Sequence, residues 1–189
     1  MQGPSEKPSF QTARIPDSGL HRLRQFIIVK AVVYNRAAAR TGKTMQPIPV
    51  NITQFFQTNH VVSIAACADG TIWSACCFYV FDEPAARLIV LTSQKTKHGR
   101  LMAANPHIAG TVAGQPGSIT KISGIQFTAR ARLLEDEAAK KPALSLYCKT
   151  HPAARAMKSD VWALDLDTVK FTDNKLVFAQ KTHWQREEG

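Results

Sequence analysis

The chain has 189 residues, of which 44% are hydrophobic and 20% are charged. That apolar content excludes a fully disordered chain, because it is sufficient to bury a core. Lys and Arg outnumber Asp and Glu by 24 to 14, and the formal net charge of +10 suggests an anionic partner. The excess is uneven, since residues 1–44 carry a net +6 and residues 45–189 carry only +4.

The first part of the chain differs in texture from the rest. Residues 1–17 hold three prolines and are typical of a flexible end, and residues 18–40 are compatible with one helix that lacks a clean apolar stripe. After Met45, apolar residues at helical spacing predict a short helix over residues 53–59.

From residue 60 onward the pattern predicts mainly β-strands. Asp69-Gly70 is a strong hairpin signal between two apolar runs. Strands are expected over residues 61–67, 72–81, 87–92, 107–113, 122–134, 161–171 and 176–178, the last after a turn at 172–174. Helices are expected over residues 94–104 and over 135–158, the latter broken at Pro142 and Pro152. The sequence therefore predicts a mainly β, six- to seven-stranded antiparallel split barrel with a few short helices.

Several classes of protein are disfavoured. No apolar run reaches the ~20 residues that a membrane helix needs, so we expect no membrane partner. The four cysteines lack C-x-x-C spacing and the histidines lack metal-ligand spacing, which indicates reduced thiols, a cytoplasmic location and no metal site. The chain also lacks a recognition helix and a basic–aromatic surface, so we expect no nucleic acid partner despite the charge. The cysteines in question are Cys67, Cys76, Cys77 and Cys148, and the histidines are His21, His60, His107 and His151.

Several stretches, in this order, carry a family resemblance. They are Phe78–Asp82, Leu91–His98, Ala109–Val112 with Gly114–Pro116, Gly124–Phe127, and Val161–Trp162 with Lys170–Asn174. Over about residues 50–185 the chain resembles the pyridoxamine 5'-phosphate oxidase-like, FMN-binding split-barrel superfamily, in particular the small bacterial group typified by the YhbP protein. The resemblance implies an FMN cofactor and a homodimer with FMN at the subunit interface. It also implies a boundary at Met45, with a basic, flexible or non-native extension over 1–44 and the FMN-binding domain over 45–189.

A candidate phosphate site follows the third predicted strand. Hydroxyls, cations and helix N-terminal amides suit a phosphate dianion, and residues 92–98 offer all three where a strand gives way to a helix. The same residues also fit a capped helix start with a solvated basic turn. The resemblance favours phosphate binding by Thr92, Thr96, Lys97 and His98, with Ser93 and Lys95 close enough to contribute.

The resemblance also places the flavin ring. It implies that the ring lies along the second strand and bonds mainly to the strand backbone. The corresponding residues are Ala75, Cys76, Cys77, Phe78 and Tyr79. From the residues alone, the two cysteines equally fit core packing. The family pattern further points to Gln126 as a ring contact, to His183 and Trp184 at the ring edge, and to Trp162 as a core residue.

The motifs that contact the substrate in the oxidases of the family are not conserved in this sequence. Their Arg-x-His pair is replaced by Lys181-Thr182-His183, and their Glu-Phe-Trp-Gln-Gly strand by Lys170–Asn174. Lysine lacks the bidentate fork of arginine, which argues against vitamin B6 oxidation. The sequence assigns no catalytic residue. It indicates an FMN-dependent oxidoreductase of unknown substrate, with a non-catalytic flavin or small-ligand binding protein as the alternative.

Overall fold

The computed structural model describes residues 46–174 and 180–186. The expected extension over 1–44, with its helix, and the expected strand over 176–178 lie outside the described residues. The elements are α2 (Val50–Thr58), β1 (Val61–Ala68), β2 (Thr71–Asp82), η1 (Glu83–Ala85), β3 (Arg87–Leu91), α3 (Lys97–Ala104), β4 (His107–Ala113), η2 (Ile119–Lys121), β5 (Ser123–Leu133), α4 (Glu137–Thr150), η3 (Pro152–Ala156), β6 (Val161–Asp173) and β7 (Gln180–Gln185).

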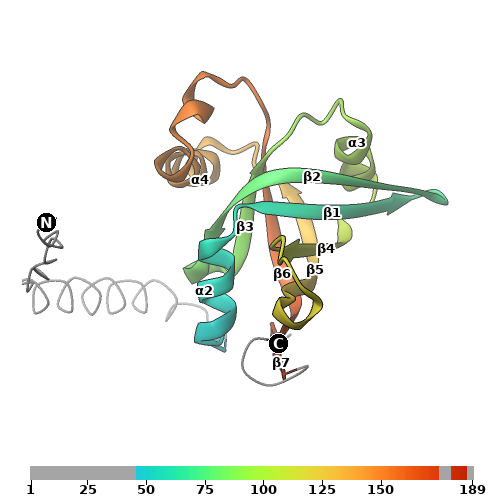
Figure 1. Cartoon of the computed structure of the whole chain (residues 1–189). Helices are drawn as coiled ribbons and strands as arrows, with labels where there is room; N and C mark the ends of the chain where they lie inside the picture. Colours follow the sequence, from blue (N-terminus) through green and yellow to red (C-terminus); the bar gives the residue numbers. More distant parts are fainter. Residues whose placement is uncertain (1–45, 175–179, 187–189) are drawn as a thin grey trace, which may run out of the picture. The chain divides into compact units, whose positions relative to one another are not determined.

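The strands form a closed antiparallel barrel. Each neighbouring pair in the order β1-β2-β3-β6-β5-β4 is hydrogen-bonded, and β4 returns to β1 to close the ring. Strand β7 pairs with the second half of β6, on the edge opposite to β5, where β3 pairs with the first half, and it lies outside the closed ring (Figure 1). The predicted fold class is therefore confirmed, as a barrel of six strands plus one.

The first hairpin forms where the sequence predicts it. Asp69 and Gly70 both have positive φ, 48° and 73°, which is the conformation that a two-residue type I′ turn requires. This turn sets the register of β1 against β2, so that Val62 faces Cys77 and Ser63 faces Cys76. Because strand side chains alternate, this register decides which residues of β2 point outward.

The barrel interior is the main core. Alternate residues of each strand fill it, and β1 and β5 show the simplest alternation of buried and exposed positions. Helix α2 adds Ile52 and Phe56 to this core, and α3 adds Met102. Helix α4 packs instead on a second apolar cluster, outside the barrel, that includes Val80 and Ile89. The helices thus leave the outer faces of β1, β4 and β5 largely uncovered (Figure 1).

Two local expectations are wrong. Helix α4 runs through Pro142 without a break, because burial of Ala143, Tyr147 and Cys148 stabilises its far half; the second expected break, before Pro152, is confirmed. Residues 172–174 are not a turn, since β6 continues to Asp173 and pairs with β7 up to Gln180. Long strand pairing overrides the local turn signal there.

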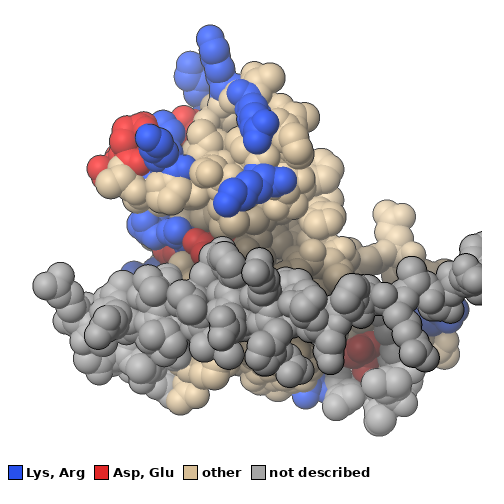
Figure 2. Space-filling view, turned by 90° about the vertical axis from the view of Figure 1, so that its left-hand side faces the viewer, with Lys and Arg blue, Asp and Glu red and all other residues tan. Residues whose placement is uncertain are grey.

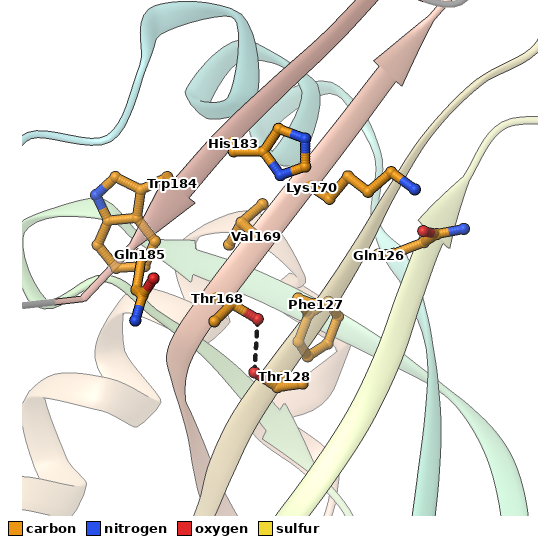
Figure 3. Close-up of a pocket in the computed structure, with 9 residues that line it drawn as sticks. All are labelled: Gln126, Phe127, Thr128, Thr168, Val169, Lys170, His183, Trp184 and Gln185. Carbon is orange, nitrogen blue, oxygen red and sulfur yellow. Dashed lines mark hydrogen bonds between the residues drawn. The ribbon is translucent and has the colours of Figure 1, made fainter.

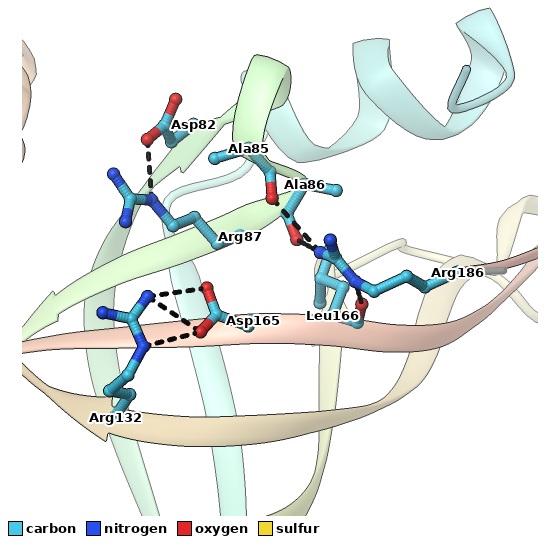
Figure 4. A network of polar contacts seen from close by, with 8 residues as sticks. All are labelled: Asp82, Ala85, Ala86, Arg87, Arg132, Asp165, Leu166 and Arg186. Carbon is cyan, nitrogen blue, oxygen red and sulfur yellow. Dashed lines mark hydrogen bonds and ion pairs between the residues drawn. The ribbon is translucent and has the colours of Figure 1, made fainter. Parts of the chain in front are cut away.

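Part of the basic charge is tied into the fold. Arg87 pairs with Asp82 at 2.8 Å, and Arg132 pairs with Asp165 at 3.0 Å. Arg186 donates to the carbonyls of Leu166, Ala85 and Ala86, and so fastens the chain after β7 to the start of β3 (Figure 4). Where described residues show in Figure 2, Lys and Arg form separate groups and not a continuous stripe. No helix within the described ranges is long and apolar enough to span a membrane.

Candidate functional site

The barrel is split along one edge of β2. Residues Thr71–Phe78 pair with β1 on one side, whereas pairing with β3 on the other side begins only at Tyr79. Strand β2 has 12 residues and β3 has five, so among the described residues the first part of β2 has no strand neighbour on its β3 side. Backbone groups on such an edge need water, a side chain or a ligand as partners. Tyr147 supplies one partner, by donating its hydroxyl to the Phe78 carbonyl at 3.3 Å.

The turn over residues 92–98 lies at this split. Thr96 is the N-cap of α3: its hydroxyl accepts from the Gly99 amide at 3.1 Å and donates to the Ser93 carbonyl at 2.7 Å. The Ser93 hydroxyl accepts from the Lys95 amide, which tightens the turn further. Gly99 is required by this packing, since a Cβ there would lie 2.4 Å from the Ser93 carbonyl oxygen. The capped helix start expected from the sequence is therefore present.

The capped turn also leaves donors for an anion. Lys97 and His98 are the first two residues of α3, so their amides have no carbonyl one turn earlier in the helix. The Lys97 ammonium lies 4.3 Å from the ring centroid of Trp73 on β2. This cation–π contact places Lys97 beside the free edge, and it identifies Trp73, which sequence reasoning missed because tryptophan at a strand position reads as core. Two exposed lysines, two free amides and nearby hydroxyls thus gather at one helix start.

His98 is the most distinctive group of the cluster. Its Nε2 lies 2.6 Å from the Thr92 hydroxyl and 3.2 Å from the Thr96 hydroxyl. Burial lowers the pKa of His98 below its usual value, so the neutral imidazole is favoured near pH 7. The Thr92 carbonyl accepts from the buried indole of Trp162 at 3.1 Å, which holds the strand end in place and confirms Trp162 as a core residue.

The five predicted ring contacts on β2 divide between the two faces of the strand. Cys76 and Phe78 point outward with exposed side chains, and Phe78 is 59% exposed. Ala75, Cys77 and Tyr79 lie on the opposite face, where burial, followed by the neighbouring Cys76, raises the pKa of the Cys77 thiol. Burial also raises the pKa of Tyr79, whose hydroxyl donates to the Phe56 carbonyl. The side chain of Tyr79 is thus a core group, and its backbone is also engaged, because its amide donates to the His60 carbonyl and its carbonyl lies 3.1 Å from Nε2 of His151.

The other two predicted contacts, Gln126 and His183, lie on the same outer face but several strands away from β2. Gln126 of β5 stands opposite Lys170 of β6, and Lys170 stands opposite His183 of β7. Together with neighbours they line an open depression of about 460 Å³ (Figure 3). The lining residues are Gln126, Phe127, Thr128, Thr168, Val169, Lys170, His183, Trp184 and Gln185. The sequence analysis included Lys170 in a stretch that carries the resemblance and departs from the oxidase pattern, but did not predict it as a site residue.

The structure therefore groups the predicted site residues into two sets. The first comprises the free part of β2 and the 92–98 turn; the second comprises Gln126 and His183. One row of outward residues connects Cys76, across β1 and β4, with Gln126 and then His183. Five strand spacings separate the ends of this row, about 24 Å along the sheet. A single flavin ring does not bridge both sets within one chain.

The chemistry of the first set fits FMN. A phosphate dianion would find hydroxyl, ammonium and helix N-terminal donors at Thr92–His98, and a flat ring would find unpaired backbone groups along β2. Within residues 46–174 and 180–186, no three His, Cys, Asp or Glu side chains gather as metal ligands do.

Solved structures with a similar fold identify the fold class of this chain. The chain is similar to a haem-binding protein from Mycobacterium smegmatis, with a TM-score of 0.59 and 14% identity over 73% of this chain and 59% of that one. It is also similar to a FAD-binding protein from Mesorhizobium loti, with a TM-score of 0.52 and 16% identity over 67% and 96% of the two chains. At these identities the likeness establishes the split-barrel fold, the fold that the resemblance implied.

The sequence relatives establish the family. A UPF0306 protein from Haemophilus ducreyi is 48% identical over 143 residues, which cover 75% of this chain and 98% of the relative. A UPF0306 protein from Yersinia enterocolitica is 39% identical over 138 residues, 73% of this chain and 93% of the relative. No model of a known protein family matches the sequence. The chain belongs to the UPF0306 family.

Proposed function

We propose that this protein is an FMN-binding flavoprotein and an oxidoreductase of the pyridoxamine phosphate oxidase-like type, close to the YhbP group. One observation carries the proposal: the unpaired edge of β2 runs beside the N-terminus of α3. The helix start supplies donors for a phosphate, and the strand edge supplies backbone donors and acceptors for a planar heterocycle. The solved split-barrel proteins described as binding FAD and haem support a planar ligand in this fold.

The proposed assembly is a homodimer with FMN at the interface. The two sets of predicted residues are too far apart for one ring, so Gln126 and His183 would come from the partner subunit. The outer face between the two sets is suited to contact, because its central residues are small: Ser63, Ala65, Cys76, Ala109 and Thr111. The exposed Val61 and Phe78 add apolar area at one end of this face. Flat faces of small residues allow two sheets to approach closely.

Each group of residues then has a defined role. The 92–98 turn holds the phosphate, with Lys95 and Lys97 balancing its charge. The free edge of β2 orients the ring, and the buried Tyr79 and Trp162 keep that edge and the turn rigid. FMN supplies the redox chemistry when bound, by taking up electrons from a reduced donor and passing them to an acceptor. We place this function in residues 45–189, which hold all the residues of the proposed site.

A visible absorption spectrum of the purified full-length protein tests the cofactor. We expect flavin bands in the protein as isolated or after addition of FMN, and release of FMN on denaturation. A colourless protein without affinity for FMN would refute the proposal. A Soret band would show that the bound group is haem and not flavin. Light scattering on the same sample tests the dimer.

Turnover separates an oxidoreductase from a flavin-binding protein without catalysis. Reduced nicotinamide should bleach the bound flavin, and an added acceptor should restore its colour. Flavin that stays oxidised with every donor tried would support the alternative of a flavin store or sensor, in which the same residues bind but do not catalyse.

A further inference from the structure

The depression over β5, β6 and β7 contains a lysine side chain that has no partner among the described residues. Lys170 stands on the middle strand, between Gln126 and His183, and its side chain extends toward Gln126 (Figure 3). Within residues 46–174 and 180–186, no hydrogen bond or ion pair engages the Lys170 ammonium. Arg132, on the same face of the sheet, is by contrast paired with Asp165 at 3.0 Å.

The residues that line the depression around Lys170 include no acidic side chain. None of the nine lining residues is Asp or Glu. Phe127, Val169 and Trp184 have buried side chains and form a rigid base. The outward lining side chains are all hydrogen-bonding groups, and those next to Lys170 can donate to an anion. An anionic group placed at Lys170 would therefore meet several donors and no repelling carboxylate.

A second row of polar groups lies beside the first. Thr128 of β5 and Thr168 of β6 share a hydrogen bond of 2.7 Å between their hydroxyls, and Gln185 of β7 stands opposite Thr168. Alternate residues of a strand are about 6.6 Å apart. The row Gln126–Lys170–His183 and the row Thr128–Thr168–Gln185 are therefore close enough for one small molecule to contact both. One row is cationic and the other is neutral, which defines an orientation for whatever binds.

We propose that this depression binds the substrate of the flavoprotein, and that the substrate is a small organic anion. Its carboxylate or phosphate contacts Lys170, Gln126 and His183, and its neutral polar end contacts the Thr128–Thr168 pair. The inference rests on the proposed function, because the partner subunit's flavin would lie beside this surface. It adds the substrate class and makes Lys170 the residue that selects for negative charge.

Calorimetric titration of the FMN-loaded, full-length protein tests the inference, with malonate and inorganic phosphate as probes and malonamide as the uncharged counterpart of malonate. We expect malonate or phosphate to bind and malonamide not to bind. Lys170→Gln should weaken binding of the anion about tenfold or more, as loss of a charge-assisted hydrogen bond predicts, and Lys170→Arg should retain most of it. Arg130→Gln is the matched control, because Arg130 is exposed on the same face of β5 but does not line the depression.

The outcomes are distinct. Equal binding of malonamide and malonate, or equal loss in Lys170→Gln and Arg130→Gln, would overturn the inference, as would absence of binding by both anions at tens of millimolar. Lys170→Gln that weakens FMN binding but not anion binding would assign Lys170 to the flavin, and would also overturn it. Failure of the proposed function is separate, because it would show as a protein that takes up no FMN before any anion is added.

Discussion

Replacement of Lys97 by Gln tests the phosphate site most directly. The substitution removes the charge but keeps a side chain of similar length at the first position of α3. If Lys97 binds the phosphate, FMN binding weakens, whereas riboflavin, which has the same ring and no phosphate, binds as before. The ratio of the two affinities therefore isolates the phosphate from the ring.

The contacts of Lys97 determine how much FMN binding free energy Lys97→Gln should lose. A hydrogen bond to a charged group contributes roughly 1.5–3 kcal/mol. Lys97 would have to leave the Trp73 ring, 4.3 Å from its ammonium, and an exposed cation–π contact is worth about 0.5–1 kcal/mol. The net loss in Lys97→Gln is about 1–2 kcal/mol, which corresponds to roughly a 5- to 30-fold rise in the Kd for FMN.

Quenching of flavin fluorescence on titration measures both affinities. Lys141→Gln, an exposed lysine on α4, is the control and should change neither value. Trp73→Leu is the companion variant: it frees Lys97, so FMN should bind up to about fivefold more tightly with riboflavin unchanged. Tryptophan fluorescence of the wild-type protein should also change as FMN draws Lys97 off Trp73.

Two results would refute this reasoning. If Lys97→Gln weakens FMN and riboflavin equally, Lys97 acts on the ring or on the fold and not on the phosphate. If Trp73→Leu weakens both ligands, Trp73 holds the ring itself, and its contact with Lys97 does not compete with the phosphate.

The remaining predictions concern stability. The pKa of His98 is lower in the folded protein than its usual value of 6.5, so between these two pKa values the unfolded chain binds more protons than the folded one. Urea denaturation should therefore show the free energy of unfolding falling as the pH drops through this window. His98→Asn should lose the contribution of His98 to this pH dependence. Pro142→Ala should raise the free energy of unfolding by about 1–3 kcal/mol, because it restores an amide inside α4; a lower urea midpoint would contradict this. Gly110→Ala should lower it by about 1–3 kcal/mol, since a Cβ there would lie 2.3 Å from the Phe127 ring. Gly117→Ala, with open space around it, should change the melting temperature little, and equal effects of both glycine variants would count against the packing argument.

The sequence was sufficient for features with local causes. Alternation of apolar residues along β5 and the Asp69-Gly70 turn determine strands and a hairpin without help from distant parts of the chain. The Thr96 cap is likewise local, because the hydroxyl and the Gly99 amide that it binds are three residues apart. Pro142 was misjudged because the burial that stabilises α4 depends on the barrel against which it packs.

The site itself needed tertiary structure. The free edge of β2 follows from the different lengths of β2 and β3, and no residue of β2 signals it. The neighbours Gln126, Lys170 and His183 are brought together by two strand registers, one of which passes the irregularity between Thr128 and Ala129. The signal that could have drawn attention to Lys170 was that it is the one basic residue of β6, whose other charged residues are Asp165, Asp167 and Asp173.

Several basic residues of the barrel have local partners. A polyanion requires a continuous basic surface, whereas here Arg87, Arg132 and Lys140 pair with carboxylates and Arg186 with backbone carbonyls. The proposals give Lys97 and Lys170 one small anion each, the phosphate of a cofactor and the anionic group of a substrate, on surfaces that a dimer would bring together. A single excess cation in a site with neutral donors selects for one anionic group, because further cations would favour larger anions and further carboxylates would repel all of them. The modest excess of +4 over residues 45–189 is therefore consistent with a protein that binds small anions.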